Sequence, residues 1–144
     1  MRILYSVSGI VLVLDQLSKI LALNFLKPRP SVPVWPNVFH LSFVENSGIA
    51  FGLFQDHPEF WTLIISGSVL CLLTASVFFR KQSFSHKLAF GFILGGAVGN
   101  WIDRLRFAHV IDFLDFRIWP VFNVADSFIT IGALLFVWFA LRGR

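Results

Sequence analysis

Residues Trp61–Phe79 read WTLIISGSVLCLLTASVFF, an apolar stretch without a charged side chain. A helix crosses the hydrocarbon core of a bilayer with about 20 residues, so this stretch has the length and the composition of a transmembrane helix. Three further apolar runs, at Ile3–Phe25, Leu88–Ile102 and Val124–Leu141, are also candidate transmembrane helices, although the first is interrupted by Asp15 and Lys19 and the last opens with Asp126. The sequence therefore predicts an all-α membrane protein that is built as a four-transmembrane-helix bundle.

The composition agrees with a chain that lies in lipid. Of the 144 residues, 56% are hydrophobic and only 14% are charged, against about 25% charged residues in an average soluble domain. These values exclude intrinsic disorder and nucleic-acid binding by a basic arm, and they argue against a soluble globule. The length fits one domain, residues 1–144, with helices over about 3–25, 61–79, 88–104 and 124–141 and outer segments over about 26–60 and 105–123.

Lysine and arginine predict how the chain is oriented. Positive charges concentrate in the cytoplasmic segments of membrane proteins, and six of them fall on one side of a four-span chain: Arg2, Arg80, Lys81, Lys87, Arg142 and Arg144. Both termini are therefore predicted to be cytoplasmic. Every proline lies in the two outer segments, where Val38–Val44 and Val110–Ile118 have a β-rich, partly alternating pattern. We expect these two stretches to be short strands on the outer face of the membrane.

Several ionisable side chains lie in or at the ends of the predicted helices, where contact with lipid is costly. Asp15 and Lys19 are four residues apart and share one helix face, either as a structural ion pair or as support for an active site. Asn100, Asp103 and Arg104 share a face at the outer end of the third helix. Arg104 is predicted to hold a carboxylate by a two-pronged bond, the alternative being an interfacial cap with a snorkelling arginine.

Two aspartates are the strongest candidates for chemistry. Asp112 lies among apolar residues, which raise the pKa of a carboxyl group, and Asp126 begins the fourth helix, either as a simple cap or as part of a site. Two close carboxyl groups share a proton, so one can act as base on a water while the other acts as acid. On a strand, residues three apart face opposite sides, so only one of Asp112 and Asp115 can face the fourth helix, and the physical argument leaves this choice open.

Other functions find less support in the sequence. The four histidines have no metal-binding spacing and no GxSxG motif occurs, so no metal or cofactor is predicted. A proton-coupled transporter could use Asp15 and Lys19 as a relay, but the inner halves of the last three helices lack polar residues to continue it. A scaffold could dimerise through Gly91, Gly95 and Gly99, whose spacing lets helices approach closely. Gly96 and Gly99 are also expected to make room for a substrate.

Five motifs occur in order along the chain: DQLSK at 15–19, ENSGIAFG at 45–52, GGAVGNWIDR at 95–104, VIDF at 110–113 and FNVADS at 122–127. Each motif alone is weak. Together, on four predicted spans in this orientation, they resemble the bacterial lipoprotein signal peptidase family, signal peptidase II. The resemblance covers essentially the whole chain.

This resemblance implies an aspartic intramembrane endopeptidase of the bacterial inner membrane. Its substrate is a diacylglyceryl-modified prolipoprotein, cleaved on the N-terminal side of the lipidated cysteine, and its partners are this substrate and membrane lipids, with a monomer sufficient for activity. The family adds to the helix bundle a small extracytoplasmic β-rich cradle and a short interfacial helix, which falls on Gly48–Phe54, and it places the active site near the outer leaflet. The catalytic dyad falls on Asp112 and Asp126, and the supporting or substrate-binding positions fall on Asn46, Gly48, Asn100, Arg104, Asn123, Asp15, Lys19 and Asp103.

Overall fold

The structure, a computed structural model, describes residues 1–48 and 58–142. Both predicted strands and all four predicted helices are present in it. The expected short helix at Gly48–Phe54 lies, apart from Gly48, outside the described residues. The elements in chain order are α1 (Arg2–Phe25), β1 (Val32–Trp35), β2 (Phe39–Asn46), α2 (Pro58–Ala75), the 3₁₀ helix η2 (Ser76–Lys81), α3 (Phe84–Phe107), β3 (Val110–Asp115) and α4 (Val124–Arg142).

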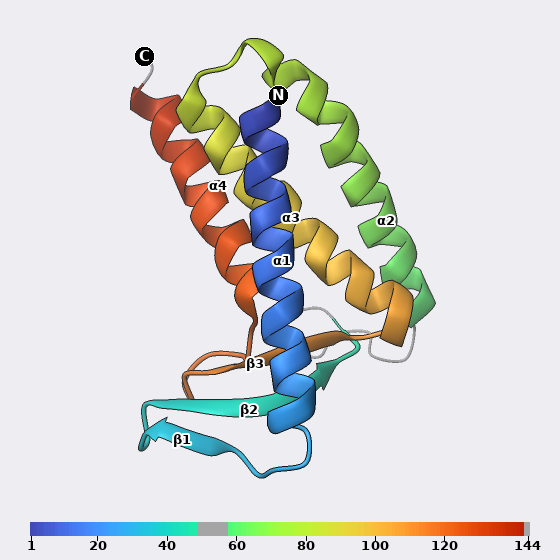
Figure 1. The fold of residues 1–144 in the computed structure, drawn as a ribbon, viewed down its shortest axis with the longest axis vertical. Coiled ribbons are helices and arrows are strands. Elements are labelled where there is room, and N and C mark those ends of the chain that lie inside the picture. The colour runs from blue at the N-terminus through green and yellow to red at the C-terminus, as the bar shows by residue number, and fades with distance from the viewer. Residues whose placement is uncertain (49–57, 143–144) are drawn as a thin grey trace.

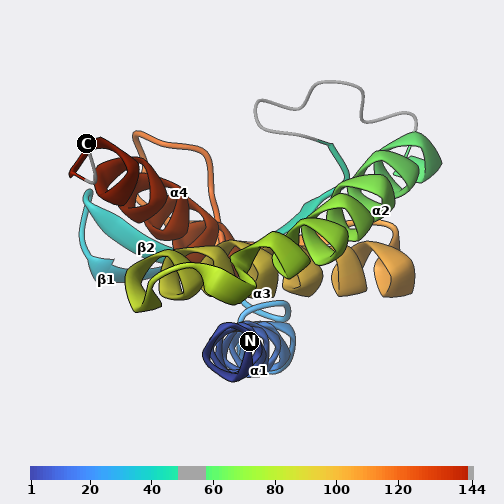
Figure 2. The ribbon, with the colours of Figure 1, turned by 90° about the horizontal axis from the view of Figure 1, so that it is seen from above.

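The helices and the sheet occupy opposite ends of the molecule. In Figure 1 the N-terminus and the C-terminal end of α4 lie at one end of the helix bundle, and the three strands lie at the other. Seen from above, α3 is the central helix (Figure 2). α1 packs against one side of α3, whereas α2 and α4 both contact α3 and diverge from each other. α3 is therefore the helix on which the other three are assembled.

A stripe of glycines on α3 sets the close approach of α1. A Cβ atom at Gly95 would lie 2.6 Å from the Ser8 carbonyl oxygen of α1, and Gly91 and Gly99 also face α1. Small residues at this spacing let two helix backbones come together in lipid. Because α1 of the same chain occupies the stripe, the face on which a dimeric scaffold would depend is already filled.

The space expected for a substrate beside α3 is also filled. A Cβ atom at Gly96 would lie 2.5 Å from the Ala125 carbonyl oxygen of α4, and Gly99 faces the Asp15 carboxyl group. The prediction that Gly96 and Gly99 make room for a substrate is therefore wrong, because both glycines serve packing between helices.

The antiparallel sheet has the strand order β1-β2-β3. Its register places Val44 opposite Asp112 and Asn46 opposite Val110. The strand predicted over Val110–Ile118 ends earlier, at Asp115, because Arg117 adopts a left-handed backbone conformation with φ 65° that an extended strand does not contain. The sheet thus brings the first half of the predicted strand, with Asp112, beneath the ends of the helices.

Within the described residues, three helical segments are long and apolar enough to cross a membrane: Arg2–Phe25, Glu59–Lys81 and Val124–Arg142. Their outward faces carry large exposed apolar side chains such as Leu63 and Leu134, which is expected of a surface that contacts the acyl chains of lipids. The protein is a helical membrane protein with four helices, three of which are apolar spans. α3 is as long as α1 but more polar, and it has the most buried residues of the four helices.

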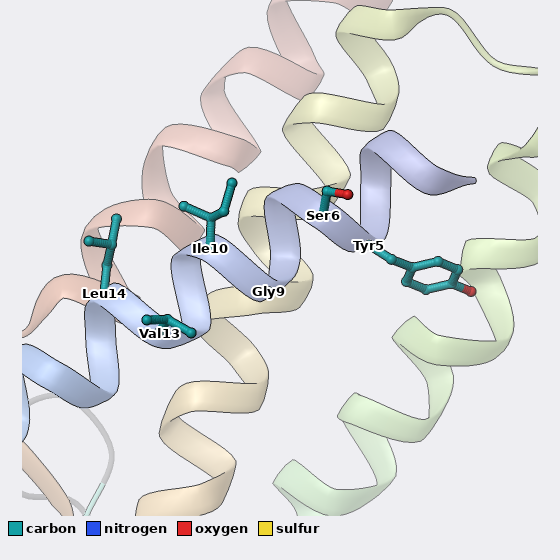
Figure 3. Close-up of a pocket in the computed structure, with 6 residues that line it drawn as sticks. All are labelled: Tyr5, Ser6, Gly9, Ile10, Val13 and Leu14. Carbon is teal, nitrogen blue, oxygen red and sulfur yellow. The ribbon is translucent and has the colours of Figure 1, made fainter.

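An apolar hollow of about 530 Å³ lies on the surface of α1 (Figure 3). Gly9 has no heavy atom within 4 Å of the position of a Cβ atom, so the hollow exists where a side chain is missing. None of its lining residues is charged, and all of them precede Asp15: Tyr5, Ser6, Gly9, Ile10, Val13 and Leu14.

Candidate active site

Asp112 lies on β3, where its side chain is only 2% exposed. Both of its carboxyl oxygens accept hydrogen bonds from asparagine amides, at 2.8 Å from Asn46 Nδ2 and at 2.7 Å from Asn123 Nδ2. Burial, and after it the charge of Asp126, raises the pKa of Asp112 to about 7, against the opposing effect of the two asparagines. A carboxyl group with this pKa can gain or lose a proton near neutral pH.

Asp126 lies in the first turn of α4 as part of a reciprocal capping arrangement. The Asp126 backbone N–H donates to Asn123 Oδ1 at 2.9 Å, and the Asn123 backbone N–H donates to Asp126 Oδ2 at 3.2 Å. This is the pattern of a capping box, with Asn123 as the N-cap residue. Asp126 therefore takes part in the helix cap without being the N-cap residue itself. The second oxygen of Asp126 accepts from Asn100 Nδ2 at 2.8 Å.

Asn123 joins the two carboxyl groups. It is fully buried, its Nδ2 donates to Asp112, and its Oδ1 accepts from the Asp126 backbone. One amide thus holds the strand aspartate and the helix aspartate against each other. The same Nδ2 also lies 3.1 Å from Asn100 Oδ1, so the three predicted asparagines, Asn46, Asn100 and Asn123, all lie at the two carboxyl groups.

Asp115 faces a different environment from Asp112. It accepts hydrogen bonds from Ser42 Oγ at 2.8 Å and from the backbone and guanidinium of Arg117 at 2.8 and 3.1 Å. Burial alone would raise the pKa of Asp115, but these hydrogen bonds outweigh it and hold the pKa below its usual value. The structure therefore brings Asp112, and not Asp115, to Asp126, as the alternation of side chains along a strand requires.

Lys19 lies at the centre of a buried ionic network next to these residues. Its Nζ is 2.9 Å from Asp15 Oδ2 and 2.8 Å from Asp103 Oδ2, and it donates to Asn100 Oδ1 at 2.9 Å. The predicted pair between Asp15 and Lys19 is present, and it extends to a third charge. Gln16, which the sequence did not single out, donates to Asp15 Oδ2 and Asp103 Oδ1 at 3.2 and 3.1 Å.

Arg104 binds main-chain oxygens rather than a carboxylate. Its Nη2 donates to the Gly48 carbonyl oxygen at 2.8 Å, and its Nη1 donates to the Ser47 carbonyl oxygen at 3.4 Å. The prediction of a two-pronged bond to a carboxylate is therefore wrong. Arg104 is only 5% exposed, and it anchors the chain just after β2. Its Nε has no hydrogen-bond partner among the described residues.

Residues 1–48 and 58–142 contain no group of three or more His, Cys, Asp or Glu side chains arranged to hold a metal ion. The described polar groups at the site are instead carboxyl groups, asparagine and glutamine amides, one buried lysine and one buried arginine. This arrangement can orient two carboxyl groups and share protons between them.

The sequence of the chain matches the model of a known protein family. The model described as signal peptidase (SPase) II matches residues 7–142. The chain belongs to the signal peptidase II family. As an aspartic peptidase of this family, A8, it cleaves signal peptides from prolipoproteins. The family membership decides against the transporter and the scaffold that the sequence left open.

Individual signal peptidase II relatives cover nearly the whole chain. The chain is 44% identical to the lipoprotein signal peptidase of Halothermothrix orenii over 133 residues, which cover 92% of this chain and 91% of the relative. It is 41% identical to the lipoprotein signal peptidase of Moorella thermoacetica over 129 residues, which cover 90% and 86%. A solved bacterial membrane enzyme has the same fold, with a TM-score of 0.84 at 27% identity, over 100% of this chain and 96% of that chain.

Proposed function

We propose that Asp112 and Asp126 form the catalytic dyad of this peptidase. The observation that carries the proposal is the shared asparagine: Asn123 binds the Asp112 carboxyl group and caps the helix turn that holds Asp126. Asn46 and Asn100 bind the other oxygen of each carboxyl group. Each aspartate is thus oriented from two sides, which is the pre-organisation that acid–base catalysis needs.

The reaction follows from two carboxyl groups that share one proton. The ionised carboxyl group takes a proton from a water, whose oxygen attacks the carbonyl carbon of the scissile peptide bond. The protonated carboxyl group stabilises the oxyanion and then protonates the leaving nitrogen, after which the C–N bond breaks. The signal peptide leaves with a new carboxyl group and the lipoprotein with a free amine. The roles of base and acid belong to the pair, because coupled carboxyl groups titrate together.

The substrate of this reaction is a prolipoprotein whose cysteine already carries a diacylglyceryl group, and cleavage occurs on the N-terminal side of that cysteine. The dyad lies where the helix bundle meets the sheet. At such a boundary the acyl chains of the substrate stay in lipid while the peptide bond reaches polar groups.

The chain crosses the bacterial inner membrane four times, because α3 spans it in addition to the three apolar segments, and both termini lie in the cytoplasm. The N-terminus and the C-terminal end of α4 lie at the same end of the bundle (Figure 1). The element ends on this side carry the positive residues Arg2, Arg80, Lys81 and Arg142, as expected of a cytoplasmic side. The sheet then forms an extracytoplasmic cradle, and the dyad lies near the outer leaflet. All the site residues described above belong to one chain, which supports a monomer as sufficient.

The proposal is tested with the variants Asp112→Asn and Asp126→Asn, reconstituted with a lipidated prolipoprotein. Each variant keeps the size of the side chain but loses the ionisable carboxyl group, so cleavage should fall by at least about 100-fold. Asp115→Asn is the matched control, because it removes a carboxyl group from the same strand that binds Ser42 and Arg117 instead. Cleavage at the wild-type rate by either dyad variant would overturn the proposal.

The same assay tests the substrate class. Wild-type enzyme is given the precursor with and without the diacylglyceryl group on its cysteine. We expect cleavage of the lipidated precursor alone, and equal cleavage of both precursors would show that the lipid is not part of the recognised substrate.

A further inference from the structure

The residue that precedes each dyad aspartate is held by a carboxylate from another helix. The backbone N–H of Ala125, which precedes Asp126, donates to Asp15 Oδ1 at 2.9 Å. The backbone N–H of Ile111, which precedes Asp112, donates to Asp103 Oδ2 at 3.2 Å. The two dyad residues lie on different elements, α4 and β3, and the same kind of bond fixes the main chain immediately before each of them.

Both N–H groups need a partner from outside their own element. Ala125 is the second residue of α4, and the first N–H groups of a helix have no partner within it. β3 is an edge strand of the sheet, and one row of N–H groups of an edge strand points away from its neighbour. Asp15 and Asp103 supply the missing acceptors.

A single lysine connects these two carboxylates. Lys19 Nζ lies 2.9 Å from Asp15 and 2.8 Å from Asp103, and Gln16 Nε2 donates to both carboxylates as well. The side chains of Asp15, Lys19 and Asp103 are at most 2% exposed. A buried ion pair is costly unless further hydrogen bonds satisfy its charged groups. Here the main-chain N–H groups next to the dyad donate such bonds to the two carboxylates.

We infer that Asp15, Lys19 and Asp103 are positioning residues that fix the separation of the two catalytic carboxyl groups. Asp15 holds α4 at Ala125, Asp103 holds β3 at Ile111, and Lys19 fixes the distance between the two holders. The inference rests on the proposed dyad of Asp112 and Asp126. It goes beyond helix anchoring, because an ion pair that only joined α1 to α3 would need no bonds to β3 and α4.

The test compares Asp103→Asn with Asp103→Glu. The asparagine keeps an oxygen at the position that accepts from Ile111 and leaves Lys19 paired with Asp15. The glutamate keeps the charge but extends the carboxylate by one methylene and displaces β3. A positioning role therefore predicts that Asp103→Asn retains most of kcat, whereas Asp103→Glu loses on the order of 100-fold in kcat, the cost of misplacement by about 1 Å. KM should stay unchanged in both variants.

The pH dependence of kcat gives a second test, because partial unfolding lowers kcat without changing the shape of its pH profile. The two limbs of the kcat profile report the apparent pKa values of the coupled dyad. If the carboxyl groups move apart, they interact less, so the two limbs of Asp103→Glu should approach each other and narrow the profile. Asp103→Asn should keep the width of the wild-type profile.

Lys27→Met serves as the control, because it removes an exposed ion pair with Glu45 and should change neither kcat nor the profile. The inference is overturned if Asp103→Glu is more active than Asp103→Asn, which is the order expected when only the charge matters. It is also overturned if both variants keep the wild-type kcat and profile width. Failure of the dyad itself is recognised separately, by activity that survives in Asp112→Asn or Asp126→Asn.

Discussion

The Asp112 carboxyl group lies where ionisation is disfavoured. It is buried on β3, and burial together with the charge of Asp126 raises its pKa to about 7. Asn46 and Asn123 oppose this shift by hydrogen bonding to both oxygens. A side chain in this setting holds a proton that it can still release near neutral pH, and the native state loses stability in return.

The variant Asp112→Asn is therefore expected to raise Tm, and to raise it more at pH 8 than at pH 5. In the unfolded chain the carboxyl group ionises near 3.8, but in the native protein it keeps its proton to about 7. The wild-type protein thus loses stability as the pH rises through this window, and the amide does not. Each kcal/mol recovered should raise Tm by roughly 2–4 °C, measured by thermal unfolding in detergent.

Asp115→Asn is the control for this measurement. The pKa of Asp115 is lowered, so its ionised form stabilises the native state at both pH values, and its loss should lower Tm at pH 5 and at pH 8. A Tm gain for Asp112→Asn that does not grow with pH would contradict the raised pKa.

At the residue scale, contacts within one helix can be predicted from the spacing of residues in the sequence, whereas contacts between elements cannot. Asp15 and Lys19 pair as their four-residue separation predicted. Asp103 and Gln16 complete the same network, but their contact depends on the packing of α1 against α3, which no local pattern encodes. Arg104 was placed at the correct end of its helix, but its main-chain partners belong to the segment after β2, and the sequence gives no sign of that contact.

At the scale of single elements, the start of α4 combines a structural and a chemical task. Asn123 caps the helix with its Oδ1 and binds Asp112 with its Nδ2. The spacing of Asn123 and Asp126 is that of a capping box, so the helix start could be predicted from sequence. The end of β3 could not, because nothing marks Arg117 for its positive φ.

The two tasks of Asn123 can be separated by substitution. Serine is a good N-cap residue but has no amide to donate to Asp112, so Asn123→Ser should keep the helix cap and lose on the order of 100-fold in kcat. Asn123→Ala loses the cap as well and should be less stable by about 1 kcal/mol. Thermal unfolding and the cleavage assay measure both effects, and wild-type activity in Asn123→Ser would show that the amide is not needed.

The packing of α1 on α3 gives a second prediction at this scale. A Cβ atom at Gly95 would lie 2.6 Å from the Ser8 carbonyl oxygen, so Gly95→Ala forces the two helices apart and should lower Tm. Gly9 lies on α1 with open space around it, and Gly9→Ala should raise helix stability by up to about 1 kcal/mol. Both variants have the same chemical change, so equal Tm shifts would contradict the close approach at Gly95.

At the scale of the whole molecule, the sheet lies at the end of the helix bundle opposite to the N-terminus and the C-terminal end of α4 (Figure 1). The sequence predicted four helices from hydropathy and two of the three strands from alternation. It did not predict which helix is central. That outcome depends on where glycines of α3 meet α1 and α4, and hydropathy does not record such contacts.

The proposed orientation is tested with single cysteines in a chain whose Cys71 is replaced by alanine. Gln82→Cys follows η2 and Arg29→Cys follows α1, and both positions are exposed. In intact spheroplasts, a membrane-impermeant maleimide should label Arg29→Cys, and it should label Gln82→Cys only after lysis. The opposite pattern would invert the orientation, and labelling of both positions in intact cells would contradict the number of spans.

The central position of α3 has a consequence for how the chain enters the membrane. The polar groups Asn100, Asp103 and Arg104 find their partners on α4, α1 and the segment after β2. Asp103 and Arg104 carry charges near the end of α3, and releasing this helix into lipid without these partners would be costly. We therefore expect α1 to remain at the insertion machinery until α3 has been synthesised. Lys19 is then paired with Asp103 when the two helices enter the lipid.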